Sequence, residues 1–551
     1  MEMAVDKDKL RIIPFGGLGE IGRNMLVMEY NQDILIIDCG LMFPENDMLG
    51  IDVIIPDLSY VFERADRVKG VIVTHGHEDH VGALPYLLDV IKAPVYATSL
   101  TCGLLEVKLR EAGVQDVDLH TIQSGDTVSI GPFQIEFFHV SHSIPDGVGL
   151  GIHTPIGLIV HSGDFKFDYS PVDGQLTDFA KLAELGGQGV LLLLSDSTNS
   201  EKVGYTPSEQ LLGKTISRLF DDAKGRIIVA TFASNISRVQ QVIDIAQAHD
   251  RRVAVVGRSM VNNVRIARKL GYLTVPDDVL LPVNQLADLP DHQVTFICTG
   301  SQGEPTSALV RMGQRRFHSI RVMPGDTIII SATPIPGNEE FVNRTIDNLF
   351  RLEADVFYDK VMDVHVSGHA SQEEQKMLIN LLRPNYFVPV HGEYRHLVIH
   401  SKTAKQCGLA PENIFVMQTA DVLEMGPDGG EIVDHLSDDY IAVDGHGVGA
   451  VGRTILKDRQ ILAKNGFLIA VVTLDKYSST LVGEPQIVTR GFAYENEFDD
   501  LLAQAKEEIA KAVERGGTRA ELIKRLQASL ASFAVKETGR QPIVLAMVNK
   551  V

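Results

Sequence analysis

The feature that most constrains the fold is the segment THGHEDH at positions 74–80. It follows the apolar run VKGVIV, which is typical of a β-strand, and precedes VGALPYLL, which has the periodicity of a helix. A strand end holds alternate side chains in fixed directions, so the three imidazoles at positions 75–80, together with the Asp79 carboxylate, can point toward more than one ion. A solvated surface turn rarely needs such a set. The segment therefore predicts a metal-binding turn between a strand and a helix.

Three further candidate ligands also stand where an apolar strand meets a polar turn. They are His142 in FFHVSHSIPD, Asp164 in LIVHSGDF and His391 in YFVPVHGEYRH. Imidazole nitrogens and carboxylate oxygens are common zinc ligands, and a pair of such ions activates water for hydrolysis. We expect these residues to join the turn at one site.

The rhythm of the chain indicates several domains within its 551 residues. The first 170 residues or so alternate β-rich runs with turns, which predicts a layered α/β fold with mixed sheets. From residue 206 the order becomes apolar strand, polar loop, amphipathic helix, which predicts a parallel sheet. A small α/β domain follows the Gly-rich stretch DGHGVGAVG. The predicted boundaries are 1–205, 206–365, 366–445, a linker over 446–462, and 463–551.

The net charge of −21 argues against a nucleic-acid partner, but the charge is unevenly distributed. Residues 206–365 hold 18 basic residues, 14 of them Arg, and 18 acidic ones, so this segment is neutral within an acidic chain. An Arg-rich neutral segment suggests a localised binding face, although common surface arginines would give the same count.

Cysteine usage and hydropathy predict a cytoplasmic protein that does not enter a membrane. Four isolated cysteines without a CxxC pair argue against a disulfide framework and against a Cys-based zinc site. The first residues lack a signal sequence, and no apolar run approaches the roughly 18 residues of a membrane span.

The pattern H-x-H-x-D-H, followed by a distant His, an Asp and a last His, resembles the metallo-β-lactamase superfamily. The resemblance implies an αββα sandwich with two Zn²⁺ per subunit, or Mn²⁺ or Mg²⁺ in their place. It assigns one metal to His75, His77 and His142, the other to Asp79, His80 and His391, and a bridging position to Asp164.

The long segment between Asp164 and His391 resembles the β-CASP insertion of nucleases, with landmarks at Asp196 and His369. Over nearly the whole chain, motifs such as GGLGEIGRNM, TGSQGEP, HVSGHAS and VPVHGEYRH look like the ribonuclease J family, which includes the extra C-terminal domain. The boundaries above then read as a metallo-β-lactamase domain in two parts, a β-CASP insertion, a linker and a C-terminal domain.

The resemblance implies a 5′-to-3′ exoribonuclease with endonuclease activity that acts in rRNA processing and mRNA decay. It implies a single-stranded, 5′-monophosphorylated RNA substrate, and a homodimer or homotetramer formed through the C-terminal domain. Catalytic roles fall to His369, Asp196 and Asp79. Substrate contacts fall to two segments: Ala233, Ser234 and Asn235, and His365, Val366, Ser367, Gly368 and His369.

Several alternatives remain open from sequence. Ser234 or Asn235 could simply cap a helix that begins near Ile236. Asp52 and Asp444 match positions that bind a structural Ca²⁺ in some relatives, although solvated turns explain two distant acids equally well. A DNA-processing β-CASP nuclease shares the metal motif and the insertion, whereas a small-molecule metallo-hydrolase leaves the insertion without a purpose.

Overall fold

The computed structural model describes residues 9–45, 48–335, 337–445, 447–448, 453–492 and 498–551. Its contacts divide the chain into two compact units. The first comprises Met1–Phe43 and Ile54–Ile441, and the second comprises Pro44–Val53 and Ala442–Val551. Each unit is described by itself.

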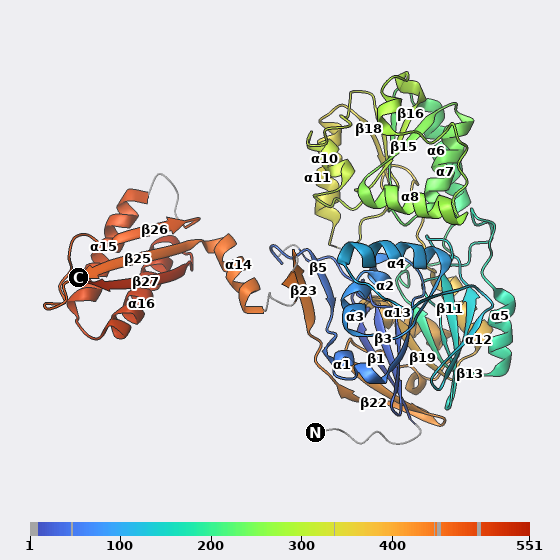
Figure 1. The fold of residues 1–551 in the computed structure, drawn as a ribbon, viewed down its shortest axis with the longest axis horizontal. Helices are drawn as coiled ribbons and strands as arrows, with labels where there is room; N and C mark the ends of the chain where they lie inside the picture. Colours follow the sequence, from blue (N-terminus) through green and yellow to red (C-terminus); the bar gives the residue numbers. More distant parts are fainter. Residues whose placement is uncertain (1–8, 46–47, 336, 446, 449–452, 493–497) are drawn as a thin grey trace. The chain divides into compact units, whose positions relative to one another are not determined.

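Two β-sheets form the base of the first unit (Figure 1). The eight-stranded sheet has the order β22 (Gly429–His435), β21 (Asp421–Gly426), β1 (Leu10–Gly16), β3 (Met25–Tyr30), β4 (Asp33–Ile37), β6 (Val68–Ile72), β7 (Val95–Thr98) and β8 (Leu119–Ile122). The six-stranded sheet has the order β19 (Tyr386–Val390), β13 (Val190–Asp196), β12 (Gly157–His161), β11 (Val148–Thr154), β10 (Phe133–His139) and β9 (Thr127–Ile130).

The two sheets pack face to face through one shared core. Buried side chains of the first sheet, such as Ile12 and Ile37, belong to the same cluster as Phe137 and Leu192 of the second. Helices cover the outer faces because successive residues of a strand point to opposite sides. The second sheet carries α5 (Phe179–Gln188), α12 (Gln372–Leu382) and α13 (Tyr394–Gln406), and α4 (Ser99–Ala112) packs on β7 and β8. The predicted αββα sandwich is confirmed.

The inserted segment forms a separate five-stranded sheet in which all neighbouring strands are parallel. Its order is β15 (Arg252–Val256), β16 (Val294–Cys298), β14 (Ile227–Ala230), β17 (Thr327–Ile330) and β18 (Asp355–Tyr358). One face packs on α6 (Glu209–Asp222), α7 (Ile236–Ala248) and α8 (Arg258–Leu270). The other face packs on α10 (Ala308–Gly313) and α11 (Glu339–Phe350). The parallel sheet predicted from the alternation of strands and helices is confirmed.

The second unit contains a small α/β domain. Its sheet has the order β26 (Gln486–Arg490), β25 (Phe467–Leu474) and β27 (Ile543–Lys550), and its core includes residues of α15 (Phe498–Glu514) and α16 (Arg519–Thr538). Within the predicted linker 446–462, residues 453–462 belong to α14 (Arg453–Asn465), while residues 446 and 449–452 lie outside the described part of the chain. The domain boundaries themselves stay a prediction.

Candidate metal centre

The histidine-rich turn lies at the carboxyl end of β6, as its sequence predicts. His77 immediately precedes the short helix α2 (Glu78–Val81), and His80 lies within that helix. Asp38, which follows β4, anchors the start of the turn by accepting a hydrogen bond from the Thr74 amide at 2.8 Å. The order strand, turn, helix therefore presents the imidazoles at one edge of the first sheet.

The structure brings the first predicted ligand group together. The nitrogens His75 Nε2 and His142 Nε2 each lie 3.1 Å from His77 Nδ1. Asp164 Oδ2 lies 3.7 Å from His75 Nε2 and 3.9 Å from His142 Nε2. One donor atom from each of the four residues falls within 4.8 Å of the others.

The second predicted group shares Asp164 with the first. Asp164 Oδ2 lies 3.3 Å from His80 Nε2, and Asp79 Oδ2 lies 3.3 Å from His391 Nε2 and 3.7 Å from His80 Nε2. The donor atoms of Asp79, His80, Asp164 and His391 again fall within 4.8 Å of one another. Residues separated by 312 positions in the sequence therefore meet around one carboxylate.

Hydrogen bonds from Nδ1 orient two of these rings, His142 and His80. His142 Nδ1 donates to the Gly368 carbonyl at 2.7 Å, and His80 Nδ1 donates to Asp38 Oδ2 at 2.8 Å. An imidazole that donates from Nδ1 leaves Nε2 for a metal, at once in His142, whose pKa is low, and after loss of the Nε2 proton in His80, whose pKa is raised. A carbonyl or carboxylate that accepts from Nδ1 is the usual support of a metal-bound histidine. The donor set therefore fits a metal site.

Asp38 supports both groups at once, a role that the sequence analysis missed. Its Oδ2 also accepts from the Thr74 hydroxyl at 2.8 Å, and that hydroxyl lies 3.1 Å from His75 Nδ1. One carboxylate thereby orients His80 directly and His75 through Thr74. Its position at the end of a strand, like the ligands themselves, is the signal that could have identified it.

Burial and mutual contacts set the protonation of the cluster. Burial lowers the pKa of His77 to about 4 and, together with neighbouring imidazoles, holds the pKa values of His75 and His142 well below their usual range. Burial opposes the charge on Asp164, yet His391 and the other imidazoles hold its pKa low. Three neutral imidazoles beside a buried anionic carboxylate are in the protonation states that metal binding requires.

Asp196 and His369, the predicted catalytic pair, form a contact at the edge of the same cluster. His369 Nδ1 lies 2.8 Å from Asp196 Oδ2 and 4.0 Å from Asp164 Oδ2. Asp196 Oδ1 accepts from the Thr198 hydroxyl at 2.8 Å, and that hydroxyl lies 2.8 Å from His391 Nδ1. Sequence reasoning did not single out Thr198, which connects the catalytic pair to the second ligand group.

The two predicted substrate-binding segments lie on opposite sides of a buried arginine. Asn235 accepts from the Arg238 amide at 2.9 Å and so caps α7, which is the simpler of the two roles expected for it. The guanidinium of Arg238 donates to the Val364 carbonyl at 3.3 Å, one residue before His365. Arg238 therefore connects the segment Ala233–Asn235 with the residue that precedes the segment His365–His369.

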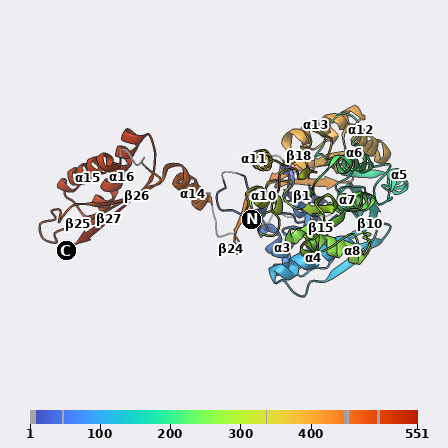
Figure 2. The same ribbon diagram turned by 90° about the horizontal axis from the view of Figure 1, so that it is seen from above.

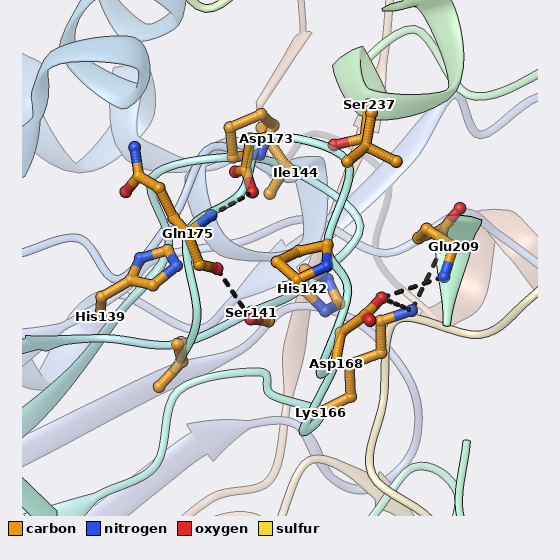
Figure 3. Close-up of a pocket in the computed structure, with 14 residues that line it drawn as sticks. His139, Ser141, His142, Ile144, Lys166, Asp168, Asp173, Gln175, Glu209 and Ser237 are labelled. Carbon is orange, nitrogen blue, oxygen red and sulfur yellow. Dashed lines mark hydrogen bonds and ion pairs between the residues drawn. The ribbon is translucent and has the colours of Figure 1, made fainter. Parts of the chain in front are cut away.

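A cavity beside His142 reaches the same junction (Figure 3). Its wall includes Lys166, whose ammonium lies 3.5 Å from both Asp168 Oδ2 and Glu209 Oε1. Arg238 pairs with the other oxygen of Glu209. These buried charges join the sandwich to the inserted domain, and Lys166, Asp168 and Glu209 line the same cavity as His142.

The predicted cation site at Asp52 and Asp444 contains an arginine in the structure. Within the second unit, Arg459 pairs with Asp444 and donates to the carbonyls of Leu49 and Gly50 at 3.0 and 3.1 Å, while Asp52 accepts from the Gly445 amide at 2.7 Å. Neither acid belongs to a ligand group among the described residues. A structural Ca²⁺ at this position stays a prediction.

The sandwich, the inserted parallel sheet and the His/Asp clusters together define a metallo-β-lactamase-type hydrolase. Four family descriptions match consecutive parts of the chain. They are the metallo-β-lactamase superfamily over residues 18–202, the ribonuclease J β-CASP domain over 224–349, the Zn-dependent metallo-hydrolase RNA specificity domain over 358–417, and the ribonuclease J C-terminal domain over 454–551.

Curated relatives match over the full length. The chain is 43% identical to ribonuclease J2 of Bacillus subtilis, with 99% of each chain covered. It is 40% identical to ribonuclease J 1 of Streptococcus pyogenes, over 99% of this chain and 98% of the relative. It is 42% identical to ribonuclease J of Synechocystis, over 98% and 86%. The chain belongs to the ribonuclease J family, and it is a hydrolytic ribonuclease.

One solved structure supports the fold alone. A protein of unknown function from Enterococcus faecalis aligns with a TM-score of 0.54 and 16% identity, over 76% of this chain and 100% of that one. Separately, no helix within the described ranges is long and apolar enough to cross a membrane.

Proposed function

We propose that the protein is a two-metal 5′-to-3′ exoribonuclease with additional endonuclease activity, acting on single-stranded, 5′-monophosphorylated RNA in rRNA processing and mRNA decay. The observation that carries the proposal is the pair of ligand groups that share Asp164. A shared carboxylate suits two cations placed close enough to contact one phosphate.

In this proposal His75, His77 and His142 bind one Zn²⁺, and Asp79, His80 and His391 bind the other, with Asp164 between them. Mn²⁺ or Mg²⁺ can replace zinc where they are more available. The bound pair supplies an activated water and neutralises charge that develops on the phosphate. The side chain of Asp79 is 30% exposed, so this ligand position is open to solvent.

The protein's own side chains then orient the substrate and move the proton. Asp196 fixes the tautomer of His369 by accepting from its Nδ1, so His369 Nε2 remains for the scissile phosphate or its leaving oxygen. The segments Ala233–Asn235 and His365–His369 would hold the RNA backbone near this ring, with amides and hydroxyls that contact phosphate irrespective of the base.

The experiment compares matched RNA and DNA strands carrying a 5′-monophosphate, triphosphate or hydroxyl. Wild type is expected to degrade 5′-monophosphorylated RNA fastest, and His77→Ala to show neither activity nor a full metal content by mass spectrometry. His120→Ala, which changes a histidine 46% exposed at its side chain, serves as the control. Equal activity of wild type and His77→Ala, or equal rates on RNA and DNA, would overturn the proposal.

We further infer self-association through the C-terminal domain. The face of its sheet away from the core carries Val488, Leu545 and Met547, which are 46, 48 and 56% exposed, and Val488 and Leu545 both pair with Ile469. Leu545→Glu with Met547→Glu should lower the mass measured by light scattering, whereas Val535→Glu on α16 should not. An unchanged mass for the double variant would contradict the inference.

We place the enzyme in the cytoplasm. All four cysteines are free thiols, and three of them are buried, as suits a reducing compartment.

A further inference from the structure

The longest acid-free basic stretch of the inserted domain includes helix α8. Residues 251–276 contain six basic side chains and no Asp or Glu, in a chain whose net charge is −21. Such a concentration creates a local positive potential that an anionic polymer can find even on an acidic protein. Within the neutral inserted segment, the excess of basic side chains is therefore concentrated on α8 and the residues just before it.

Three of these cations share one face of α8. Arg258, Arg265 and Lys269 are exposed and stand at positions i, i+7 and i+11, which fall within about 40° around a helix of 3.6 residues per turn. They extend over about 16 Å along the axis. Among the described residues none of the three forms an ion pair with a carboxylate, whereas Arg268, on a different face, pairs with Asp277.

The opposite faces of α8 fix its position. Met260, Val264 and Ala267 are buried in the core of the inserted domain. Ile266 and Leu270 pack so closely on Gly103 of α4 that a methyl group there would lie 2.7 Å from Ile266. Figures 1 and 2 both show α8 beside α4, at the junction of the inserted domain with the sandwich.

The first residue of the stripe lies at the edge of the sheet that faces the metal centre. Arg258 follows the carboxyl end of β15, and the parallel strands β14 and β17 end at the same edge, before Asn235 and at Ser331. The Ser331 hydroxyl and the Arg238 guanidinium both donate hydrogen bonds to the Val364 carbonyl, which precedes the segment that leads to His369. The stripe therefore begins at the edge where the RNA is proposed to bind.

We propose that Arg258, Arg265 and Lys269 form a second contact for single-stranded RNA, holding the sugar-phosphate backbone of the strand that extends beyond the catalytic centre. Three cations in a row, without an ion pair among the described residues, complement an anionic backbone, and contacts to phosphate carry no sequence preference. The inference rests on the proposed RNA substrate and adds a binding surface outside the catalytic residues.

The chain provides a matched control for charge. Arg315, Arg316 and Arg321 also lie in an acid-free stretch and are exposed, but they lead into the amino end of β17, at the opposite edge of the sheet. The triple variant Arg258→Gln, Arg265→Gln, Lys269→Gln and the triple variant Arg315→Gln, Arg316→Gln, Arg321→Gln remove the same charge from the two edges.

Binding of a 20-nucleotide RNA to the full chain is measured by fluorescence anisotropy over a range of salt, with a chelator to prevent cleavage. For the α8 variant the slope of log K against log[salt] should fall by about 2, since each phosphate contact on a single strand contributes about 0.7, and affinity at 0.1 M salt should fall by up to about 100-fold. The control triple should change the slope by less than half as much. Cleavage of a four-nucleotide RNA by the metal-loaded enzyme should stay within about twofold of wild type.

Equal weakening by the two triples would overturn the proposal in favour of a general charge effect, and an unchanged slope for the α8 variant would overturn it outright. A changed oligomeric mass for the α8 variant would assign the stripe to contact with a second copy instead. Failure of the proposed function is a separate outcome, because it would show as loss of RNA cleavage or RNA preference in the wild-type enzyme.

Discussion

Gly368→Ala tests whether the loop before His369 supports the metal centre. A Cβ at this position would lie 2.7 Å from both Cε1 and Nδ1 of His142 and 3.0 Å from Cβ of Ser143. Carbon atoms in contact prefer about 3.5–4.0 Å, so the imidazole of His142 must retreat by about 1 Å or the loop must move by as much. The φ of Gly368 lies outside the left-handed region, so the substitution acts through this contact alone.

The displacement also breaks the 2.7 Å hydrogen bond from His142 Nδ1 to the Gly368 carbonyl. Loss of such a supporting bond typically weakens metal affinity by about 10–100-fold. A shift of about 1 Å near the reacting groups costs about 100-fold in rate. We therefore expect a weaker first metal site and, at saturating metal, an RNA cleavage rate reduced by about two orders of magnitude.

Zinc affinity is measured by competition with a chelator of known affinity, and cleavage is measured with excess zinc. Gly187→Ala is the matched control, because a Cβ there meets no atom within 4 Å. If Gly368→Ala keeps its zinc affinity within about twofold of wild type and cleaves at the wild-type rate, the supporting role of this contact is wrong.

Three further predictions concern buried groups. Glu374 accepts hydrogen bonds from the backbone amides of residues 167, 206 and 371 at 2.8, 2.7 and 2.9 Å. Glu374→Gln should therefore lower the free energy of unfolding, measured in urea, by about 1–3 kcal/mol. Glu373→Gln, which changes a more exposed side chain of the same helix, should leave it unchanged. Burial holds the pKa of His400 at about 3, whereas in the unfolded chain this imidazole takes up a proton below about pH 6.5. The neutral ring therefore contributes fully to the free energy of unfolding above pH 6.5, and about 2–3 kcal/mol is lost by pH 4.5. His400→Gln should flatten that loss, and an unaltered pH dependence of stability would refute the assignment. Burial disfavours the protonated forms of His80 and His391, but Asp164 and neighbouring carboxylates raise both pKa values, that of His391 to about 10. Zinc binding at pH 7.5 should therefore release about two protons. Calorimetry in buffers of different ionisation enthalpy measures this number, and release of no proton would contradict the prediction.

Local patterns predicted the layers of the fold and the grouping of the ligand residues. The alternation of strands and helices was enough for the parallel sheet, and strand-end positions were enough to bring His142, Asp164 and His391 to the turn. The pairing of strands that are distant in the sequence could not be predicted from such local patterns. Strand β21, for example, extends the first sheet by pairing with β1, more than 400 residues earlier, which no local periodicity encodes.

The residues that the sequence analysis missed act through tertiary hydrogen bonds. Asp38 and Thr198 are ordinary strand-end residues until the fold places them against histidines of the two groups. The ion pair of Arg459 with Asp444 likewise depends on the position of α14 in the folded chain. Chemistry carried by a motif could be predicted, whereas support supplied by a single side chain from another element required coordinates.

The division of the metal centre across the chain has a consequence during protein synthesis. The ribosome releases Asp79 long before His391, and the whole β-CASP segment must emerge between them. A nascent polypeptide shorter than 391 residues lacks the last imidazole and its backbone neighbours, so it cannot assemble a complete centre. A ribonuclease built in this way cannot become active before the ribosome has passed codon 391 of its own message.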